Sequence, residues 1–504
     1  MFFHFQLSVF NFQLTKMSTL KEKLKQERDA EWRGEVRNLK KNKDRTAIPR
    51  VSMPEAPPKE RSRSYVEVNS GLTQEQAVME ASRCLDCPEP TCITGCPVEI
   101  NIPKFIKNIE RGEFLKAAQT LKETSTLPAV CGRVCPQEKQ CEEQCIYKAK
   151  LNKEPVAIGY LERFAADYEQ QSGEISIPEM AAPNGVKIGV IGSGPAGLTF
   201  AGEMAKLGYK VVVFEALHEI GGVLKYGIPE FRLPNRIVDI EIESLRKMGV
   251  TFETNFIVGK TASVEDLQNE GFKGFFVGSG AGLPRFMNIP GENLSGILSS
   301  NEYLTRVNLM GAAATENDTP VCCGKNVAVI GGGNTAMDSV RTALRLGAER
   351  AVIIYRRSLD EMPARVEEIK HAMEEGVEFL TLNNPVEYFG DEKGRVKQVR
   401  VQKMELGEPD SSGRRSPVPV EGSEYIIDVD TVVVSVGVSP NPLIPQSLPE
   451  LKVSRWGTLI VDDNTMQTSI PQLFAGGDIV RGGATVILAM GDGRKAAYAM
   501  NDYL

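Results

Sequence analysis

Eight of the ten cysteines in this 504-residue chain lie in two short stretches. The first stretch, CLDCPEPTCITGCP over residues 84–97, has the spacing C-x2-C-x4-C-x3-C-P. The second stretch, CGRVCPQEKQCEEQC over residues 131–145, holds four more cysteines. Closely spaced thiolates are metal ligands and redox groups, so these two stretches are the first candidates for chemistry.

The first stretch follows the ferredoxin spacing, in which three close cysteines serve one iron–sulfur cluster and the fourth, before a proline, serves another. Cys84, Cys87 and Cys92 then need one further ligand, and Cys96 needs three. The second stretch can supply them. A tetrahedral zinc site of four cysteines is the alternative. We favour iron–sulfur because the Cys-Pro dipeptides belong to that pattern.

Composition limits the class of protein. The net charge of −7 gives no field that would attract nucleic acid, and no apolar run is long enough for a membrane span. Clustered cysteines that bind metal are typical of a reducing compartment, so we expect a cytoplasmic protein. Cys322 and Cys323 lie apart, and we interpret them as loop thiols, with a vicinal redox pair as the alternative.

A dinucleotide-binding pattern begins at residue 186, where VKIGVIGSGPAGLTFAGEMAKLGYKVVVFEA predicts strand, tight turn, helix and strand. Gly192, Gly194 and Gly197 form GxGxxG in this turn, with Pro195 and Ala196 between them. Such glycines permit the turn, the approach of a pyrophosphate and close packing of helix on strand. Glu215 ends the second strand, where a carboxylate accepts hydrogen bonds from ribose hydroxyls.

The same pattern recurs about 140 residues later in GKNVAVIGGGNTAMDSVRTALRLGAERAVIIYRR. Its turn contains Gly331, Gly333, Asn334 and Thr335, and its second strand ends in Tyr355-Arg356-Arg357. Arginines at this place bind a ribose 2′-phosphate, which a carboxylate would repel. The second site is therefore predicted to prefer NADP(H) over NAD(H). The alternative is that the arginines only end an exposed strand.

Two dinucleotide sites in one chain imply a resident flavin and a diffusible nicotinamide that exchange a hydride. The flavin carries this chemistry, so we assign no catalytic side chain and no role to His4, His218 or His371. A two-electron flavin also needs a one-electron outlet, which favours iron–sulfur over zinc. Near the C-terminus, Gly477 and Asp478 follow a predicted strand and precede a helix, where they could hold the ribityl chain and the flavin ring edge.

Residues 65–170 are predicted to be helical. Thr73 and Gln76 form a capping box, Pro103 suits the first turn of a helix, and EFLKAAQTLKE is amphipathic. Before them, residues 17–64 are charged and poor in large apolar side chains. We predict a solvated arm with a helix around residues 18–41, then an extended Pro-rich linker. We also expect translation to start at Met17, because the preceding residues lack the features of a secretory signal.

Further motifs follow in order: LPAVCGRVCP, IGYLERF, GGVLKYGIPEFRLP, GGGNTAMD, YRR with EMPAR, and AGGDI. Together with the motifs above, they resemble the small (beta) subunit family of NADPH-dependent glutamate synthase from about residue 50 to the end. Related families are the large subunit of NADH-dependent ferredoxin:NADP oxidoreductase and the N-terminal half of dihydropyrimidine dehydrogenase. The PEAPPKERSRSYVEV segment is more similar to these ferredoxin-linked relatives.

The resemblance implies specific ligands. One 4Fe-4S cluster would take Cys84, Cys87, Cys92 and Cys145, and a second would take Cys96, Cys135, Cys141 and Glu162. By spacing alone, Cys131 is an equal candidate for the last place. The resemblance also puts Gly222, Lys225 and Arg232 against FAD, and Arg365 with Arg356 and Arg357 against NADPH.

The implied architecture is α/β, with a helical iron–sulfur domain before two Rossmann-like domains, the nicotinamide domain being inserted in the flavin domain. The predicted divisions are an arm and linker over 1–64, an iron–sulfur domain over 65–172, flavin-domain parts over 173–291 and 439–504, and a nicotinamide domain over 292–438.

The implied activity is electron transfer from NADPH through FAD and two 4Fe-4S clusters to a glutamate synthase large subunit, which would form glutamate from 2-oxoglutarate. A ferredoxin-linked or other flavoprotein partner is the alternative. The chain itself offers no N-terminal cysteine for glutamine hydrolysis and no room for an eight-fold βα barrel. A disulfide reductase is a rival from another class, but neither dinucleotide domain holds the CxxC it needs. A zinc-stabilised, non-enzymatic protein is a weaker rival.

Overall fold

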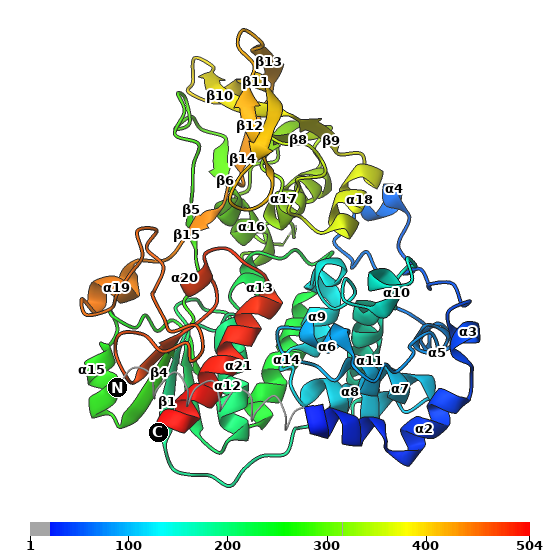
Figure 1. Ribbon diagram of the computed structural model, residues 1–504. Coiled ribbons are helices and arrows are strands. Elements are labelled where there is room, and N and C mark those ends of the chain that lie inside the picture. Colours follow the sequence, from blue (N-terminus) through cyan, green and yellow to red (C-terminus); the bar gives the residue numbers. More distant parts are fainter. Residues whose placement is uncertain (1–20, 315) are drawn as a thin grey trace. The chain divides into compact units, whose positions relative to one another are not determined.

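The computed structural model describes residues 21–314 and 316–504, which form two compact units. The first unit combines residues 21–54 with residues 71–178, and the second combines residues 55–70 with residues 179–504. Figure 1 colours the chain by sequence. The expected start at Met17 and the beginning of the helix predicted for residues 18–41 lie outside the described residues. Among the residues described, no helix is both long and apolar enough to cross a bilayer.

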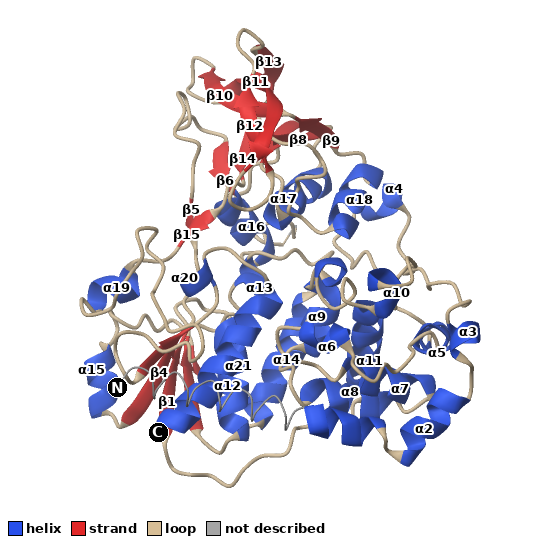
Figure 2. Cartoon of the chain, viewed as in Figure 1, coloured by secondary structure: helices blue, strands red, loops and turns tan. Residues whose placement is uncertain are grey.

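The first unit is built from helices and loops, as Figure 2 shows. The predicted capping box at Thr73 and Gln76 is present, and Pro103 lies in the first turn of its helix. The elements are α2 (Glu31–Asn38), α3 (Asn42–Arg45), α5 (Gln74–Ala81), α6 (Thr91–Thr94), α7 (Ile102–Glu110), α8 (Phe114–Lys122), α9 (Pro128–Val134), a 3-10 turn (Gln137–Lys139), α10 (Ile146–Ala149) and α11 (Ile158–Ser172). The longest of these, α11, packs against α8 and α9.

The described part of the arm is packed rather than solvated, so the sequence prediction was wrong here. Arg33 and Arg37 both pair with Asp86, which is fully buried between the first two cysteines. Arg45 pairs with Glu110 at 2.7 Å and donates to the carbonyl oxygen of Ser82 at 2.6 Å. A charged composition favours disorder only when the charges stay in water, and here they meet opposite charges inside the unit.

The second unit contains two parallel sheets, each flanked by helices. The first dinucleotide domain has the strand order β16-β4-β1-β2-β3, and the second has β6-β14-β7-β8-β9. The first uses β1 (Lys187–Ile191), β2 (Lys210–Phe214), β3 (Thr251–Glu253), β4 (Phe272–Val277) and β16 (Leu473–Ala475), with α12 (Pro195–Lys206), α13 (Val223–Tyr226), α14 (Asn235–Lys247), α15 (Val264–Asn269), α19 (Leu443–Ser447), α20 (Asp478–Arg481) and α21 (Val486–Tyr503).

The second dinucleotide domain carries an additional antiparallel sheet. Its parallel core uses β6 (Ile297–Ser299), β7 (Asn326–Ile330), β8 (Arg350–Tyr355), β9 (Glu378–Thr381) and β14 (Thr431–Val434), with α16 (Ser300–Asn308), α17 (Asn334–Arg345) and α18 (Val366–Glu374). The antiparallel sheet uses β10 (Asn383–Gly390), β11 (Val396–Pro409), β12 (Arg415–Pro419) and β13 (Tyr425–Asp428).

The second domain is inserted in the first, as expected. β16, from the end of the chain, pairs with β4, which precedes the inserted domain. At the two crossings, β5 (Leu283–Pro284) and β15 (Val438–Ser439) pair in antiparallel fashion. The predicted α/β class with two Rossmann-like domains is therefore confirmed, whereas the individual domain boundaries stay predictions.

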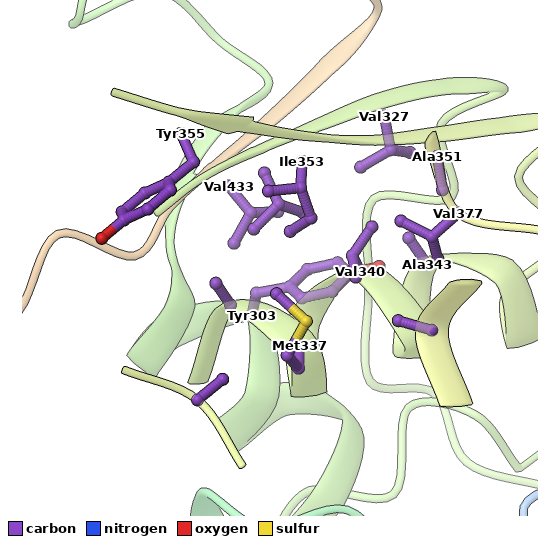
Figure 3. Close-up of a cluster of buried hydrophobic side chains, with 14 of the residues drawn as sticks. Tyr303, Val327, Met337, Val340, Ala343, Ala351, Ile353, Tyr355, Val377 and Val433 are labelled. Carbon is purple, nitrogen blue, oxygen red and sulfur yellow. The ribbon is translucent and has the colours of Figure 1, made fainter. Parts of the chain in front are cut away.

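The core of the second domain fixes the helix that follows its glycine turn. Buried side chains of β7, β8 and β14, among them Val327, Ile353 and Val433, face Met337 and Val340 of α17 (Figure 3). Tyr303 of α16 and Ala343 of α17 belong to the same cluster. Because these contacts bury apolar surface on one face of α17, its N-terminus is held at the carboxyl end of β7.

Residues 55–70 form part of the second unit although they lie between α3 and α5 of the first unit in the sequence. They contain the short helix α4 (Pro58–Arg61), where an extended linker was predicted. Arg61 is almost fully buried and pairs with Glu55, Glu374 and Glu375. The segment is therefore tied to α18 by buried charge.

Close packing of α12 on α21 joins the two sequence parts of the first domain, and it gives a test of the fold. A Cβ added at Gly493 of α21 would lie 2.3 Å from the carbonyl oxygen of Ala196. We expect Gly493→Ala to destabilise the protein by about 1–3 kcal/mol, because overpacking outweighs the gain in helix propensity. The measurement is thermal unfolding. Gly34→Ala in α2 is the control, since its nearest contact would be the Arg37 side chain at 3.7 Å, an ordinary van der Waals distance, and equal effects of the two would contradict the expectation.

Candidate cofactor-binding sites

The first glycine turn has the geometry of a dinucleotide-binding loop. Gly192 has φ +101°, and a Cβ there would lie 2.7 Å from the carbonyl oxygen of Gly278. A Cβ at Gly197 would lie 2.0 Å from the carbonyl oxygen of Gly192. At Gly194 the nearest contact is only that of Gly278 at 3.9 Å, so the turn is open at the glycine that precedes α12. This opening lies at a helix N-terminus, where backbone N–H groups bind phosphate.

Glu215 lies directly beneath this turn. It is 6% exposed, and its Oε2 accepts from the backbone N–H of Ser193 at 2.9 Å and from the Ser193 hydroxyl at 2.5 Å. Its Oε1 accepts from the Leu217 N–H at 2.9 Å. The Ser193 oxygen in turn accepts from the Gly221 N–H. The carboxylate therefore joins the glycine turn to the GGVLKYG segment, and its Oε1, which accepts one hydrogen bond, can accept a further one.

The GGVLKYG segment approaches the same turn. Gly222 has φ +55°, and its Cβ would lie 3.0 Å from the Cα of Gly194. Lys225 is buried, and its ammonium pairs with Asp239 at 2.5 Å and Glu219 at 3.3 Å. The backbone of this segment thus lies at the predicted flavin site, while the Lys225 side chain is held by carboxylates at its edge.

Tyr226, which the sequence did not single out, connects the two ends of this site. The pKa of its hydroxyl is raised to about 12, mainly by burial and in addition by the nearby carboxylates of Asp478 and Glu215. The pKa of Asp478 is itself raised to about 6, mainly by burial, although its Oδ1 accepts from the Ala484 N–H. The three side chains therefore lie near one another, with Glu215 buried and the other two half-buried. A tyrosine one residue after a predicted lysine contact was the available signal.

The strand-end glycines complete the first site. Pro195 opens α12, and a Cβ at Gly477 would lie 3.0 Å from the Cβ of Ala196. The Gly477 N–H donates to Asp492 of α21, which also pairs with Arg481. The predicted residues of the first site, from Gly192 to Asp478, are thus brought to one edge of the sheet, although the cofactor contacts themselves stay predictions.

The second glycine turn repeats this plan. Gly331 has φ +135°, and its Cβ would lie 2.4 Å from the carbonyl oxygen of Ser435. A Cβ at Gly333 would meet nothing within 4 Å, so the turn is open at the N-terminus of α17. Asn334 accepts from the backbone N–H of Arg365 at 2.9 Å, and Thr335 lies next to it in the first turn of α17. The EMPAR loop is therefore tied to the glycine turn.

Two serines at equivalent strand ends were also missed. Ser279 follows β4 beside Gly192, and Ser435 follows β14 beside Gly331. Each hydroxyl is buried and has no hydrogen-bond partner among the described residues. Buried hydroxyls normally find a partner, so both positions fit a polar group of a bound ligand.

The three arginines predicted to contact NADPH have different surroundings. Arg356 is exposed and pairs with no side chain in the described part of the chain. Arg357 is buried and pairs with Asp410 at 2.5 Å. Arg365 is also buried and pairs with Glu367 at 2.8 Å. Their roles toward NADPH stay predictions.

Arg232 makes a contact that the sequence did not predict. Its guanidinium is buried and pairs with Asp338 of α17 at 2.7 Å and with Glu368 of α18 at 3.4 Å. Burial raises the pKa of Asp338 to about 6, although Arg232 opposes this shift. Burial would also raise the pKa of Glu368, but Arg232 and Arg341 lower it to about 2. The expected contact of Arg232 with FAD stays a prediction, whereas its ion pairs join the two dinucleotide domains.

The first predicted set of cysteine ligands is gathered in the first unit. Burial raises the pKa of Cys84 to about 12 and is also the main cause of the raised pKa of Cys92, to which the neighbouring Cys84, Cys145 and Cys87 contribute. Cys87 and Cys92 are half-buried, and Cys84 and Cys145 are buried. The ammonium of Lys107 donates to the Cys84 carbonyl oxygen at 2.6 Å and so places a positive charge beside these thiols.

The second set includes the predicted glutamate. Burial is the main cause of the raised pKa of Cys96 and of Cys141, and Glu162 and Cys135 raise both further. Close contact of α9 with α11 brings these residues together, because a Cβ at Gly132 would lie 2.5 Å from the backbone nitrogen of Arg163. The grouping matches the ligand set that was expected from the family resemblance, and the ligation itself stays a prediction.

One group of three candidate metal ligands lies close together outside the two cysteine stretches. A tetrahedral zinc with about 2.3 Å bonds brings its sulfurs within about 4 Å of one another. Among the described residues, the one set of three candidate ligands within 4.8 Å is Glu55, Glu367 and His371. Glu55 of that set already pairs with Arg61 at 3.0 Å, so we interpret it as an ion-pair cluster.

Comparison with known proteins identifies the family. Residues 61–174 match the model described as dihydropyrimidine dehydrogenase domain II, 4Fe-4S cluster, and residues 186–493 match pyridine nucleotide-disulphide oxidoreductase. The glutamate synthase (NADPH) small chain of Azospirillum brasilense is 38% identical over 453 residues, which cover 89% of this chain and 93% of that relative. The chain belongs to the glutamate synthase small-chain family.

Proteins with other names are also similar to this chain. The NADP(+)-dependent formate dehydrogenase subunit beta of Moorella thermoacetica is 38% identical over 436 residues, covering 82% of this chain and 60% of that relative. Among solved structures, FprA of Mycobacterium tuberculosis in complex with NADPH has a TM-score of 0.53 and 20% identity, covering 64% of this chain and 84% of FprA. This last likeness concerns the fold of the dinucleotide domains.

The ligand assignment in this small-chain family member can be tested with two cysteine variants. We expect Cys141→Ala to lower the iron content from about eight to about four atoms per chain, because it removes a predicted ligand of one of the two predicted 4Fe-4S clusters. Cys131→Ala should keep about eight irons. The measurement is iron and sulfide analysis with electron paramagnetic resonance of the reduced protein. Loss of iron from Cys131→Ala, with full iron in Glu162→Ala, would show that Cys131 is the ligand.

The buried carboxylates give a pH dependence. Glu375 pairs with Arg341 and Arg345, which lower its pKa to about 2 against the opposing effect of burial. Because the pKa of Glu375 is lower in the folded protein, its ion pairs stabilise the fold at pH values above 4.5, the pKa in the unfolded chain. This stabilisation is lost as the pH falls from 4.5 toward 2. We expect Glu375→Gln to cost about 3 kcal/mol at pH 7 and to flatten the acid dependence in that window. Urea unfolding followed by circular dichroism measures both.

The matched control for this variant is Glu270→Gln, since Glu270 is exposed and pairs with no described side chain. It should change neither the stability at neutral pH nor the acid dependence. An unchanged acid profile in Glu375→Gln would contradict the importance of this buried carboxylate.

Proposed function

We propose that this chain is the NADPH-oxidising FAD and iron–sulfur subunit of a glutamate synthase. Electrons from NADPH would reach a large subunit that forms glutamate from 2-oxoglutarate. The observation that carries the proposal is the grouping of cysteines into two sets, Cys84, Cys87, Cys92 and Cys145 in one and Cys96, Cys135 and Cys141 with Glu162 in the other. These sets occur in a chain that also has two open dinucleotide turns.

The first dinucleotide turn fits FAD. The open position at Gly194 accommodates the pyrophosphate at the N-terminus of α12, and Glu215 can accept from the ribose. Asp478, Tyr226 and the orphan hydroxyl of Ser279 offer polar groups to the remainder of the molecule. When bound, the flavin accepts hydride from a nicotinamide and releases electrons one at a time.

The second turn fits NADPH. Gly333 leaves room for its pyrophosphate, and Arg356 and Arg365 provide positive charge at the ends of β8 and of the EMPAR loop. A carboxylate at the strand end, as in the first domain, would select against a 2′-phosphate. The pair of Arg232 with Asp338 would keep the segment beside the flavin and the helix beside the nicotinamide in a fixed relation.

The two ligand sets fit two 4Fe-4S clusters. Burial raises the pKa of thiols in both sets, so without a metal these cysteines stay protonated at neutral pH. Metal binding favours the deprotonated form, and it therefore offsets the cost of burial. We place the protein in the cytoplasm, because a reducing compartment keeps such ligands as thiols.

A second candidate partner is a different flavoprotein or ferredoxin-linked complex. The observation in its favour is the similarity to a formate dehydrogenase subunit beta. That subunit is 38% identical to this chain, the same identity as the glutamate synthase small chain of Azospirillum brasilense has. In both versions the chain oxidises NADPH and passes electrons to another polypeptide, so the second version changes the partner and not the cofactors.

The proposal predicts how the purified protein responds to nicotinamides. In an anaerobic titration, NADPH should bleach the flavin absorbance and reduce the clusters beyond the capacity of the flavin. NADH should do so at least about tenfold less efficiently, because it lacks the phosphate that the arginines bind. The measurement is absorbance against added equivalents, with the flavin identified after extraction.

The control is the same titration after the clusters have been removed with a chelator, in which the uptake should stop at the flavin. Equal reaction with NADH would contradict NADPH specificity. Absence of flavin or iron from reconstituted protein would contradict the cofactor assignment.

A further inference from the structure

The two arginines that follow β8 lie in opposite environments. Arg356 is exposed and has no side-chain partner in the part of the chain that the structure describes. Arg357 is 6% exposed. Both follow the strand whose end lies at the ribose of a bound dinucleotide. Adjacent residues of the same type can therefore have different functions here.

The Arg357 side chain binds to the hairpin of β11 and β12. Its Nη2 pairs with Oδ2 of Asp410 at 2.5 Å, and its Nε donates to the carbonyl oxygen of Arg415 at 2.8 Å. Asp410 follows β11, and Arg415 opens β12. The guanidinium thus contacts both sides of the hairpin tip, which is residues 410–415.

Asp410 also holds the tip together. Its Oδ1 accepts from the N–H and the hydroxyl of Ser412, at 2.8 and 2.5 Å, and its backbone N–H donates to the carbonyl oxygen of Arg414 at 2.8 Å. One carboxylate therefore uses one oxygen for the turn and the other for Arg357. The tip is fixed at the end of β8 by a charge-assisted hydrogen bond to a buried group.

We propose that Arg357 and Asp410 form a positioning pair for the hairpin tip, and that, of the two adjacent arginines, Arg356 is the one that recognises the 2′-phosphate of NADPH. This inference rests on the proposed function and deepens it. If Arg357 turned to a phosphate, it would leave the Asp410 carboxylate unpaired beside another anion, and like charges repel. Arg356 has its five donors available and needs no such exchange.

The pair has a second effect on specificity. Asp410 is a carboxylate near a site that must accept a phosphate, and its charge is matched by Arg357. Removing Arg357 alone would leave that negative charge unmatched. A single Arg357 variant would therefore lose NADPH affinity whether Arg357 binds the phosphate or only positions the hairpin tip. A variant that neutralises both partners, Arg357→Gln with Asp410→Asn, separates the two roles.

The test measures the affinities of 2′,5′-ADP and 5′-AMP for the holoprotein by calorimetry, and the ratio of these affinities reports recognition of the 2′-phosphate. We expect Arg356→Gln to lower this ratio about tenfold or more, because it removes a charge-assisted contact. The double variant should change the ratio by less than about threefold, a size that coupling between neighbouring substitutions can produce without loss of a phosphate ligand.

The second readout is the rate of tryptic cleavage at Arg414 and Arg415 in the hairpin tip. We expect the double variant to be cleaved about tenfold faster than the wild type, since the loss of one charged hydrogen bond increases local opening. Arg356→Gln should leave this rate unchanged. The two variants therefore affect different readouts.

Two results would overturn the inference. If the double variant lowers the ratio as Arg356→Gln does, Arg357 is a phosphate ligand. If cleavage of the tip is unchanged in the double variant, the pair has no positioning role. A wild-type protein without preference for 2′,5′-ADP would refute the NADPH specificity and the role of Arg356, and the cleavage assay would still decide the role of the pair.

Discussion

The ion pair between Arg232 and Asp338 is the interaction on which the second unit depends. It joins the segment that follows the flavin turn to the helix that follows the nicotinamide turn, and both partners are buried. A buried charge without its partner costs several kcal/mol, so the two domains cannot separate here without a large penalty. Arg341 and Arg345 stack on Phe231, the neighbour of Arg232, and extend the same network. Hydride transfer requires a fixed distance between two rings, and rigid buried charge provides it.

Buried charge organises the first unit in the same way. Asp86 lies between two predicted cluster ligands and is held by Arg33 and Arg37 of the arm. Lys107 adds positive charge at Cys84. A 4Fe-4S cluster with four thiolates is anionic, and basic groups around it make its reduced form less unfavourable. The arm that composition alone would make a solvated tail therefore packs against the segment that carries the predicted ligands.

Much of the fold followed from local patterns in the sequence. Glycines at fixed offsets after a β-branched strand predicted both Rossmann turns, and a capping box and a first-turn proline predicted helices of the first unit, because these signals act over a few residues. The buried arginines were misjudged for a physical reason. Whether Arg33 meets water or Asp86 depends on a residue 53 positions away. Tyr226 and the strand-end serines were missed because only the folded sheet edges bring them beside the turns.

The two dinucleotide domains share a turn but differ in how they expose its ribose end. In the first domain Glu215 is 6% exposed and is covered by the GGVLKYG segment. In the second, the equivalent strand ends in an exposed Arg356. A covered carboxylate suits a cofactor that stays bound, since its ribose contacts are shielded from water. An exposed guanidinium suits a substrate that must arrive and leave, because a solvated charge attracts a phosphate at long range and binds it only moderately. The same βαβ scaffold can thus serve a resident flavin and an exchanging nicotinamide through the side chains at the end of one strand.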